Sequence, residues 1–482
     1  MAITSATAAN LTPSPVMKTL ASNYLDFAGG TNGWADQYLP EVIAQEAESY
    51  GNRTMAGFLR QVGAEESMSS DQVIWSEQGR LHLAYECTMT DVTASTIAIS
   101  KTQDGVAQTT DHGINVGDMV LIAGGGQTVT ARVSVAASSS AAITVTPYGY
   151  AHMTNAGFVN GDDTCKLLVF GSEWGKGTEN KVRSNKPVFN VYDNKPVIIK
   201  DMYEVSGSDV AQIGWVEVSG EDGQNGYYWY LKAEGDTRAR FTDYLEMVCI
   251  EAEKNVAASN IDTGGGAASA VDSHGTEGLF KAITSRGHQS SGVTGVNAAT
   301  DLAEFDAMLA AFDENGAIEE NMLFVNRATA LAIDDMLASM NSYGAGGTSY
   351  GVFDNSEDMA LNLGFSGFRR GSYDFYKSDW KYLNDKQTRG GINAAATGGE
   401  AIRGVVIPAG TSSVYDQSLG KNMKRPFLHV RYRASNLESR KFKTWVTGSV
   451  GATTSDLDAM TMNFLSERCM ITQGANNFCL LN

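Results

Sequence analysis

The chain has 482 residues, 43% of them hydrophobic and 19% charged, and a formal net charge of −19 at pH 7. This length and apolar content favour a globular protein of roughly two to four domains. The negative charge argues against gripping nucleic acid through its phosphates, which takes clusters of Lys and Arg. The start, MAITSATAANLTPSP, lacks the basic and apolar parts of a secretory signal, and no apolar run could span a membrane, so we expect a soluble protein made in a cytoplasm.

Side chains that bind metals or form disulfides are scattered along the sequence. The five cysteines contain no C-x-x-C pair, and the six histidines have no partners at the spacing typical of metal ligands. We therefore predict buried free thiols, no metal site, no cofactor and no local catalytic motif. The cysteines are Cys87, Cys165, Cys249, Cys469 and Cys479.

The run 171–178, GSEWGKGT, resembles a phosphate-binding loop but does not fit its pattern. It is one residue too short, and Gly177 separates Lys176 from Thr178. The residues after it favour a strand over the helix whose N-terminus would hold a phosphate. Nucleotide binding is not expected here, while a catalytic group assembled from distant residues stays open.

Residues 1–64 are predicted to form an arm followed by two short helices. The first 30 residues are small and polar and contain Pro13 and Pro15. Between residues 34 and 62, apolar side chains recur at helical spacing, with a break at Gly51. These side chains are Leu39, Val42, Ile43, Ala47, Met55, Phe58 and Leu59.

Residues 65–205 are predicted to be β-rich. Residues 65–85 alternate around Trp75 and indicate an extended strand or hairpin arm that turns near Gln78 and Gly79. Residues 86–172 are rich in Ser, Thr, Ala and Val, and they predict a small inserted β-barrel or sandwich. Its strands are expected at 119–122, 129–135 and 143–146. Residues 173–205 then contain a long two-stranded element from Pro187 to Val205.

Residues 206–299 contain the longest predicted helix, over 227–256. Its apolar side chains recur every three or four residues, and about 30 residues at about 1.5 Å each would make a rod of about 45 Å. Gly235 is its weak point, costing about 1 kcal/mol against alanine. The polar stretch 257–300 favours a flexible loop with a short helix near Leu279. The recurring apolar side chains of the predicted helix are Phe241, Leu245, Val248, Ala252 and Val256.

Residues 300–425 begin with a helix–strand–helix pattern. A stripe from Leu302 to Phe312 predicts a helix capped by Thr300 or Asp301, followed by the strand MLFVN and a second helix. From Tyr350 onward the pattern is mostly β. Strands are expected in DFYKSDWKYL, RGVVIP, RPFLHVRYR, KFKTWVTG and MTMNFLSERCMIT. The last of these belong to 426–482 and must pair with earlier strands.

The order of these parts resembles the major capsid protein of tailed phages, which has the Hong Kong 97-like fold. The most specific matches are NMLFVNRATALAIDDMLASM and the ending DAMTMNFLSERCMITQGANNFCLLN. The resemblance covers most of the chain, through architecture more than through fixed motifs. The stretch QVIWSEQGRLH is similar to capsid proteins of crAss-like phages.

This resemblance implies an α+β fold with a spine helix at 227–256 in a peripheral domain, 206–299, that is completed by 426–482. Residues 65–85 and 173–205 would be the two sides of an extended loop that reaches a neighbouring subunit. Residues 86–172 would be an inserted β-barrel domain at its tip. An axial α/β domain would occupy 300–425.

The resemblance further implies a structural protein and no enzyme. Pentamers and hexamers of the chain would form the icosahedral head shell around double-stranded DNA, without sequence-specific binding and without a membrane. Assembly would take place in the bacterial host cytoplasm, and the protein would reside in the virion. Portal, scaffold or decoration proteins are expected partners. A scaffolding segment at the N-terminus and the Lys–Asn pair of the family's covalent cross-link are not located in this sequence.

Within this interpretation, the expected assembly contacts are on the arm and the spine. Trp75, Glu77 and Arg80 combine an aromatic anchor with opposite charges, although Trp75 could equally be a cross-strand core residue. Arg238 and Arg240 could form ion pairs between subunits or decorate a solvated helix face. Three other interpretations remain: a nanocompartment shell, a hydrolase with a β-rich accessory domain, and a secreted β-rich adhesin.

Overall fold

A computed structural model describes most of the chain from residue 64 onward. The described residues are 64–79, 82–103, 105, 107, 112–136, 141–178, 189–208, 210, 228–255, 275–292, 298–316, 318–340, 367–396, 401–409, 411–416, 421–450 and 454–482. The predicted N-terminal arm and helical pair, before Ala64, and the predicted contact residue Arg80 lie outside these residues.

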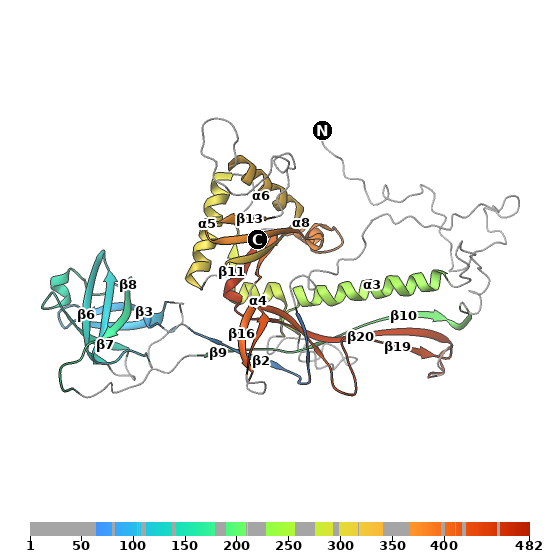
Figure 1. The fold of residues 1–482 in the computed structure, drawn as a ribbon, viewed down its shortest axis with the longest axis horizontal. Coiled ribbons are helices and arrows are strands. Elements are labelled where there is room, and N and C mark those ends of the chain that lie inside the picture. Colours follow the sequence, from blue (N-terminus) through green and yellow to red (C-terminus); the bar gives the residue numbers. More distant parts are fainter. Residues whose placement is uncertain are drawn as a thin grey trace. The chain divides into compact units, whose positions relative to one another are not determined.

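The fold is mixed α and β, in two compact units that are described separately (Figure 1). Residues Ile74–Tyr192 form the second unit, and Asp193–Asn482 together with the residues before Ile74 form the first. The chain therefore leaves the first unit and returns to it once, and it builds the second unit between these two points.

The second unit contains a closed barrel in which the strands follow the order β3-β4-β7-β6-β5-β8. Alternate side chains point inward, as the period of two in a strand requires, and they include Met89, Ile97 and Ile122, each fully buried. The three predicted strands are confirmed as β5, β6 and β7, and β3, β4 and β8 complete the barrel. The bounds are β3 Ala84–Asp91, β4 Thr96–Thr102, β5 Asp118–Gly124, β6 Gln127–Ala136, β7 Ala142–Pro147 and β8 Cys165–Ser172, with a 3-10 turn at Met153–Ala156.

A two-stranded sheet is formed by β2 (Val73–Gln78) and β9 (Phe189–Asn194). The predicted strand around Trp75 is thereby confirmed. The two strands expected between Pro187 and Val205 are present as β9 and β10 (Val197–Ser206), but they do not form one element, because β9 pairs with β2 whereas β10 pairs with the C-terminal β20. The amide of Asn194 explains the separation, since it donates to the carbonyls of Glu277 and Met470 and fixes the chain at the junction.

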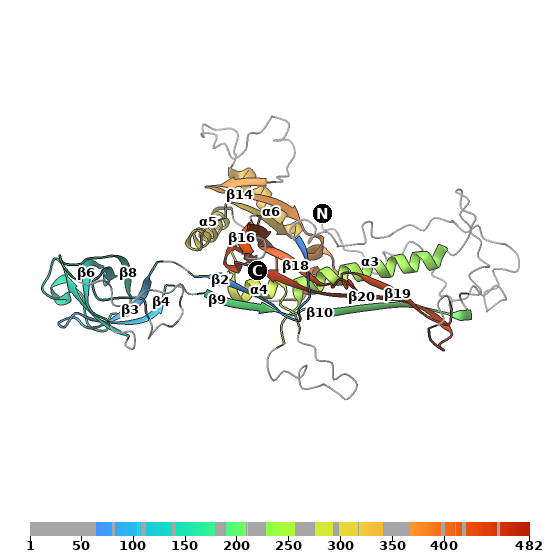
Figure 2. The same ribbon diagram turned by 60° about the horizontal axis from the view of Figure 1, so that its bottom comes forward.

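The first unit contains a sheet in the order β1-β18-β20-β10, and β19 also pairs with β20. The C-terminal strands pair with earlier ones, as the sequence requires: β18 is parallel to β1, and β20 is antiparallel to β10. Figures 1 and 2 show β10, β19 and β20 running side by side along one helix. The bounds are β1 Ala64–Met68, β18 Leu428–Arg433, β19 Lys443–Gly448 and β20 Ala459–Thr472.

That helix is α3 (Tyr228–Glu251), which confirms the predicted long helix. Its 24 residues give a rod of about 36 Å. Phe241 and Leu245 are buried on the sheet against Phe464. The helix ends five residues before the predicted Val256, because the chain after Glu251 forms an antiparallel bridge between Lys254 and Gly275.

A second sheet in the first unit follows the order β11-β21-β15-β12-β14-β13. The predicted helix–strand–helix unit is confirmed as α5, β12 and α6, although α5 begins before the expected caps Thr300 and Asp301. The predicted strand DFYKSDWKYL is wrong in its second half, because β14 ends at Asp379 and a helical turn follows Trp380. The sheet strands are β11 His288–Ser290, β12 Glu320–Val325, β13 Gly367–Arg370, β14 Tyr373–Asp379, β15 Gly404–Pro408 and β21 Cys479–Leu481.

Helices cover this second sheet on both faces. Phe305 of α5 packs with Phe375 and Leu323 on one face, and Phe280 of α4 packs with Trp380 and Phe324 on the other. The second cluster also contains buried side chains of β18 and β20, so both sheets of this unit share a core. The helices are α4 Leu279–Arg286, α5 Ala298–Glu314, α6 Arg327–Met340, α7 Lys381–Asn384 and α8 Arg389–Ala395, and β16 Thr411–Asp416 pairs with β17 Lys421–Pro426.

Candidate assembly surfaces

Trp75 and Glu77 belong to the inner face of the two-stranded sheet. Trp75 is 8% exposed, and its ring lies 6.1 Å from that of Tyr192 on the facing strand. Its indole Nε1 donates a hydrogen bond to Glu77 Oε1 at 3.0 Å. Trp75 therefore packs across its own strand pair, the cross-strand role that the sequence left open.

The opposite face of the same strand pair exposes two aliphatic side chains. Ile74 is 63% exposed and Val191 is 66% exposed. Because side chains alternate along a strand, these two residues face away from Trp75 and Tyr192. A two-stranded sheet alone is marginally stable in water, so an apolar outer face favours contact with another chain. Sequence analysis did not single out Ile74 and Val191, because the aromatic residues next to them were the clearer feature of the alternating pattern.

Arg238 and Arg240 both have partners within their own chain. The Arg240 guanidinium donates to Asp201 Oδ2 of β10 at 3.2 and 3.0 Å. Arg238 lies over the Phe442 ring, with Cζ 5.3 Å from the ring centre. Both arginines fasten α3 to its sheet, and an exposed pair such as Arg240 with Asp201 contributes only about 0 to 1 kcal/mol.

The face of the first sheet that points away from α3 carries further exposed apolar side chains. In register, Met202 of β10 and Trp445 of β19 lie opposite Asn463 of β20, and Ile198 lies on the same face of β10. Ile198 is 49% exposed, Met202 60% and Trp445 36%. Since β10 is the end strand of its sheet, this face and edge could accept a neighbouring chain. The apolar residues on both faces of 197–205 were a signal that sequence reasoning left unused.

The cysteines are buried free thiols, as predicted. Burial raises the pKa of each thiol to about 12, so none is a thiolate near neutral pH. Among the described residues, no group of three His, Cys, Asp or Glu side chains could hold a metal ion. In the run 171–178, β8 ends at Ser172 and no helix follows up to Thr178.

A groove lies between α3 and the α7–α8 segment. Tyr382 donates to Glu251 Oε1, and Arg389 Nη1 donates to Glu251 Oε2, each at 2.8 Å. Burial, together with the Glu251 carboxylate, raises the pKa of Tyr382 well above its usual range. These groups satisfy one another, so they fasten helices rather than present a reactive centre. No helix in the described part of the chain is both long and apolar enough to span a membrane.

No family model and no curated protein matches this chain. Solved structures do match. The mature capsid of bacteriophage PhiM1 has TM-score 0.40 and 9% identity, covering 95% of this chain and 96% of that chain. The capsid of cyanophage P-SCSP1u has TM-score 0.40 and 8% identity, covering 95% and 98%.

The capsid of a native GTA particle also matches, with TM-score 0.39 and 10% identity, covering 94% of this chain and 96% of that chain. All three of these solved structures are capsids, and the finer likeness to crAss-like phages stays a prediction.

Proposed function

We propose that this chain is a major capsid protein whose pentamers and hexamers form the icosahedral head shell of a tailed phage around double-stranded DNA. The observation that carries the proposal is the strand pair β2–β9, whose outer face exposes Ile74 and Val191. Such a strand pair gains stability when a neighbouring copy covers that face.

The other elements fit the same role. In the Hong Kong 97-like arrangement, α3 is the spine helix, and 65–85 with 173–205 form the extended loop. The barrel is the inserted domain, 300–425 is the axial domain, and 206–299 with 426–482 is the peripheral domain. A rigid rod and an arm that contacts a neighbouring copy are what a thin curved shell requires of each subunit.

The charge of the chain supports enclosure of DNA without binding to it. A net charge of −19 repels phosphates, so packaged DNA would not adhere to the shell wall. We propose a purely structural role, in the virion after assembly in the host cytoplasm, with portal, scaffold or decoration proteins as further partners.

Negative-stain electron microscopy and sedimentation velocity of the purified protein test this proposal, with and without a scaffold protein from the same genome. Closed shells or ring-shaped capsomers are expected. A monomer in every condition would contradict the shell proposal and favour the hydrolase interpretation. Shells purified from infected cells should contain DNA, and shells that consistently enclose protein cargo instead would favour a nanocompartment.

A further inference from the structure

Two cysteines lie directly opposite each other where the barrel of the second unit closes. Cys87 on β3 is the register partner of Cys165 on β8, and the pairing of these two strands closes the barrel. Residues that are directly opposite in an antiparallel pair share one face of the sheet, and both side chains are fully buried in the barrel interior. The two cysteines are 78 positions apart along the chain, so their spacing in the sequence gives no sign of this pairing.

The strand register sets the distance between the two cysteines. Directly opposite Cα atoms in an antiparallel sheet are about 4.5 to 5.5 Å apart. Cysteines joined by a disulfide have Cα atoms about 4.4 to 6.8 Å apart, so β3 and β8 can accept a disulfide without a change in their pairing. Cys87 Sγ donates a hydrogen bond to the carbonyl of Cys165 at 3.4 Å, which places the Cys87 sulfur beside its partner.

The barrel interior gives the Cys165 sulfur two places to lie. Its Sγ now lies beside Gly124 on β5, where a Cβ on the glycine would collide with it. Strand β8 lies between β5 and β3 in the barrel, so this rotamer directs the thiol toward β5. A change to another staggered χ1 position would direct Sγ toward Cys87 instead. A side-chain rotation therefore separates the reduced pair from a disulfide.

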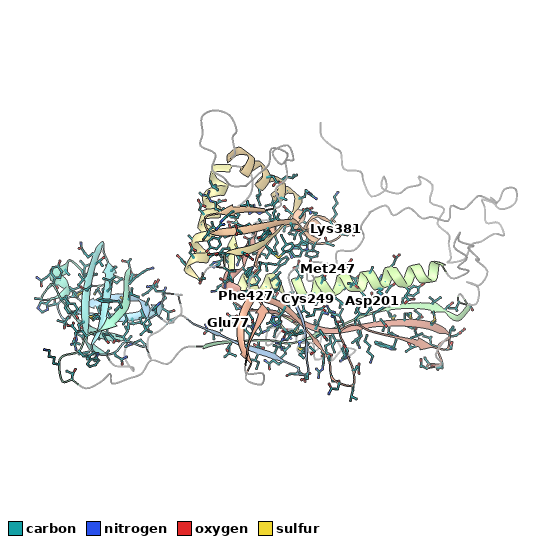
Figure 3. All side chains as sticks on the ribbon, viewed as in Figure 1. Glu77, Asp201, Met247, Cys249, Lys381 and Phe427 are labelled. Atoms are coloured by element: carbon teal, nitrogen blue, oxygen red, sulfur yellow. The ribbon has the colours of Figure 1, made fainter. Side chains whose placement is uncertain are left out.

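The other three cysteines are also buried, but they have no cysteine opposite them in the strand register. Cys469 of β20 lies opposite Arg431, and Cys479 of β21 lies opposite Val406. Cys249 belongs to a helix, α3, where Figure 3 labels it. Burial raises the pKa of all five thiols to about 12, so burial and acidity alone would treat the five alike.

We propose that Cys87 and Cys165 form a disulfide that joins β3 to β8 when the protein meets a disulfide oxidant such as oxidised glutathione. Under the reducing conditions of a cytoplasm both thiols stay free. This inference does not rest on the shell proposal, because it concerns one unit of a single chain.

The reaction is a thiol–disulfide exchange in two steps. One cysteine thiolate attacks a sulfur of oxidised glutathione, which forms a mixed disulfide and releases one glutathione thiolate. The second cysteine thiolate attacks the first cysteine's sulfur, which forms the S–S bond and releases the other glutathione thiolate. The protein gives up two electrons and two protons, and the two glutathione molecules take them up. Because both thiols are buried, the exchange proceeds while β3 and β8 are apart, and it is slow in the folded protein.

Mass spectrometry of the full-length protein tests the proposal. One sample is incubated folded with oxidised and reduced glutathione, and a second is refolded from urea in the same mixture, so that burial does not keep the oxidant out. Free thiols are then blocked in denaturant, and the digest is searched for linked peptides. We expect a peptide pair linked through Cys87 and Cys165, lighter by two hydrogens than the reduced peptides, and blocked thiols at Cys249, Cys469 and Cys479.

The disulfide should also slow the opening of the barrel. It closes a loop of 78 positions, which restricts the unfolded chain more than the folded one. Amides of β3 and β8 should exchange with solvent at least about tenfold more slowly in the oxidised than in the reduced protein. Cys87→Ala and Cys165→Ala should each abolish this slowing. Cys479→Ala, also at a buried cysteine, is the matched control and should retain it.

Three outcomes would overturn the proposal. Five blocked thiols after refolding with oxidised glutathione would mean that the register does not bring the two sulfurs together. Burial, and then the nearby Cys249 thiol, raise the pKa of Cys469, so these two cysteines are also close. A link between Cys249 and Cys469 without one between Cys87 and Cys165 would mean that strand register does not select the pair. Equal exchange of β3 and β8 in the oxidised and reduced proteins would mean that no bond holds the two strands together.

Discussion

The ion pair between Lys377 and Asp334 joins β14 to α6 inside the first unit. The two side chains are 8% and 11% exposed, and Lys377 Nζ also donates to the carbonyl of Ala330 at 3.1 Å. Lys377→Met would leave the Asp334 carboxylate buried without this cation. We expect a loss of about 3 to 5 kcal/mol in the free energy of unfolding, measured with urea.

The control for this pair is Lys281→Met. Lys281 pairs with Glu253 on the surface, where the side chains are 45% and 56% exposed. Removing it should cost no more than about 1 kcal/mol. Equal losses for the two variants would mean that burial does not decide the strength of these pairs.

We expect His288 to make the free energy of unfolding depend on pH. Burial lowers the pKa of His288 below its usual 6.5, against smaller opposing effects of Asn476 and Glu314. Its Nε2 lies 3.0 Å from Asn315 Nδ2, which also donates to the carbonyl of Ala311, so the neutral ring is the acceptor. A proton on Nε2 would break this contact.

Since the folded pKa of His288 is depressed, its contribution is present above pH 6.5 and is lost as the pH falls through the folded value. The free energy of unfolding should therefore decrease between pH 7.5 and 5.5 with a slope that His288→Gln reduces. Urea titrations at several pH values measure this slope for the wild type and for His288→Gln. Identical slopes for the two proteins would assign the pH dependence to other groups.

At the scale of elements, Gly235 is a weak point in α3 that nothing in the packing requires. A Cβ at this position would meet no described atom within 4 Å. Gly235→Ala should raise the free energy of unfolding by about 1 kcal/mol, because alanine has the higher helix propensity. Gly278→Ala should do the opposite, since its Cβ would lie 2.8 Å from Ala252 N and Ile250 O. Thermal unfolding followed by circular dichroism should show a stabilised Gly235→Ala variant and a destabilised Gly278→Ala variant.

The sequence predicted elements that depend on local periodicity and failed where distant partners decide. The stripe through Phe241 and Leu245 gave the long helix, but its end depends on the bridge from Lys254 to Gly275, which no local pattern encodes. The separation of β9 from β10 is likewise set by distant partners.

For the candidate surfaces, too, the sequence indicated what depends on local pattern and did not indicate what depends on distant partners. Trp75 was identifiable as an aromatic residue in an alternating strand, but its partner Tyr192 lies on β9, far along the chain. Ile74 looked like an ordinary strand residue until its exposure was known. The groove beside Ile392 could not be predicted from the sequence, because it depends on the packing of α8 near α3, which composition and spacing do not specify.

At the scale of the whole molecule, the barrel should fold without the rest of the chain. Strands β3 and β8 close it by pairing Ala84 with Leu168 and Cys87 with Cys165, so its two ends meet. Its interior has its own cluster of buried side chains. A fragment of residues 82–178 should unfold cooperatively and give dispersed amide signals in NMR spectra. A fragment without a cooperative transition would show that the barrel depends on the first unit.

Shell formation should depend on the outer face of the strand pair more than on any charge. Ile74→Asp and Val191→Asp each place a carboxylate where a neighbouring copy would bury an aliphatic side chain. Such burial contributes about 1.5 to 3 kcal/mol, so each change should raise the concentration needed for assembly at least about tenfold. Their circular dichroism should stay that of the wild type, because Ile74 and Val191 are 63% and 66% exposed. Leu437→Asp, at a side chain 98% exposed, is the control.

Trp75→Ala distinguishes the two faces of the strand pair. Its indole packs on Tyr192 and donates to Glu77, so truncation should weaken the strand pair itself as well as assembly. Light scattering against protein concentration, with electron microscopy of the products, measures assembly for all four variants. Wild-type assembly by Ile74→Asp and Val191→Asp would place the subunit contacts elsewhere, and the face of β10 and β19 with Met202 and Trp445 would be the next to change. Impaired assembly by these two variants and not by Leu437→Asp would support the strand pair as the arm between neighbours.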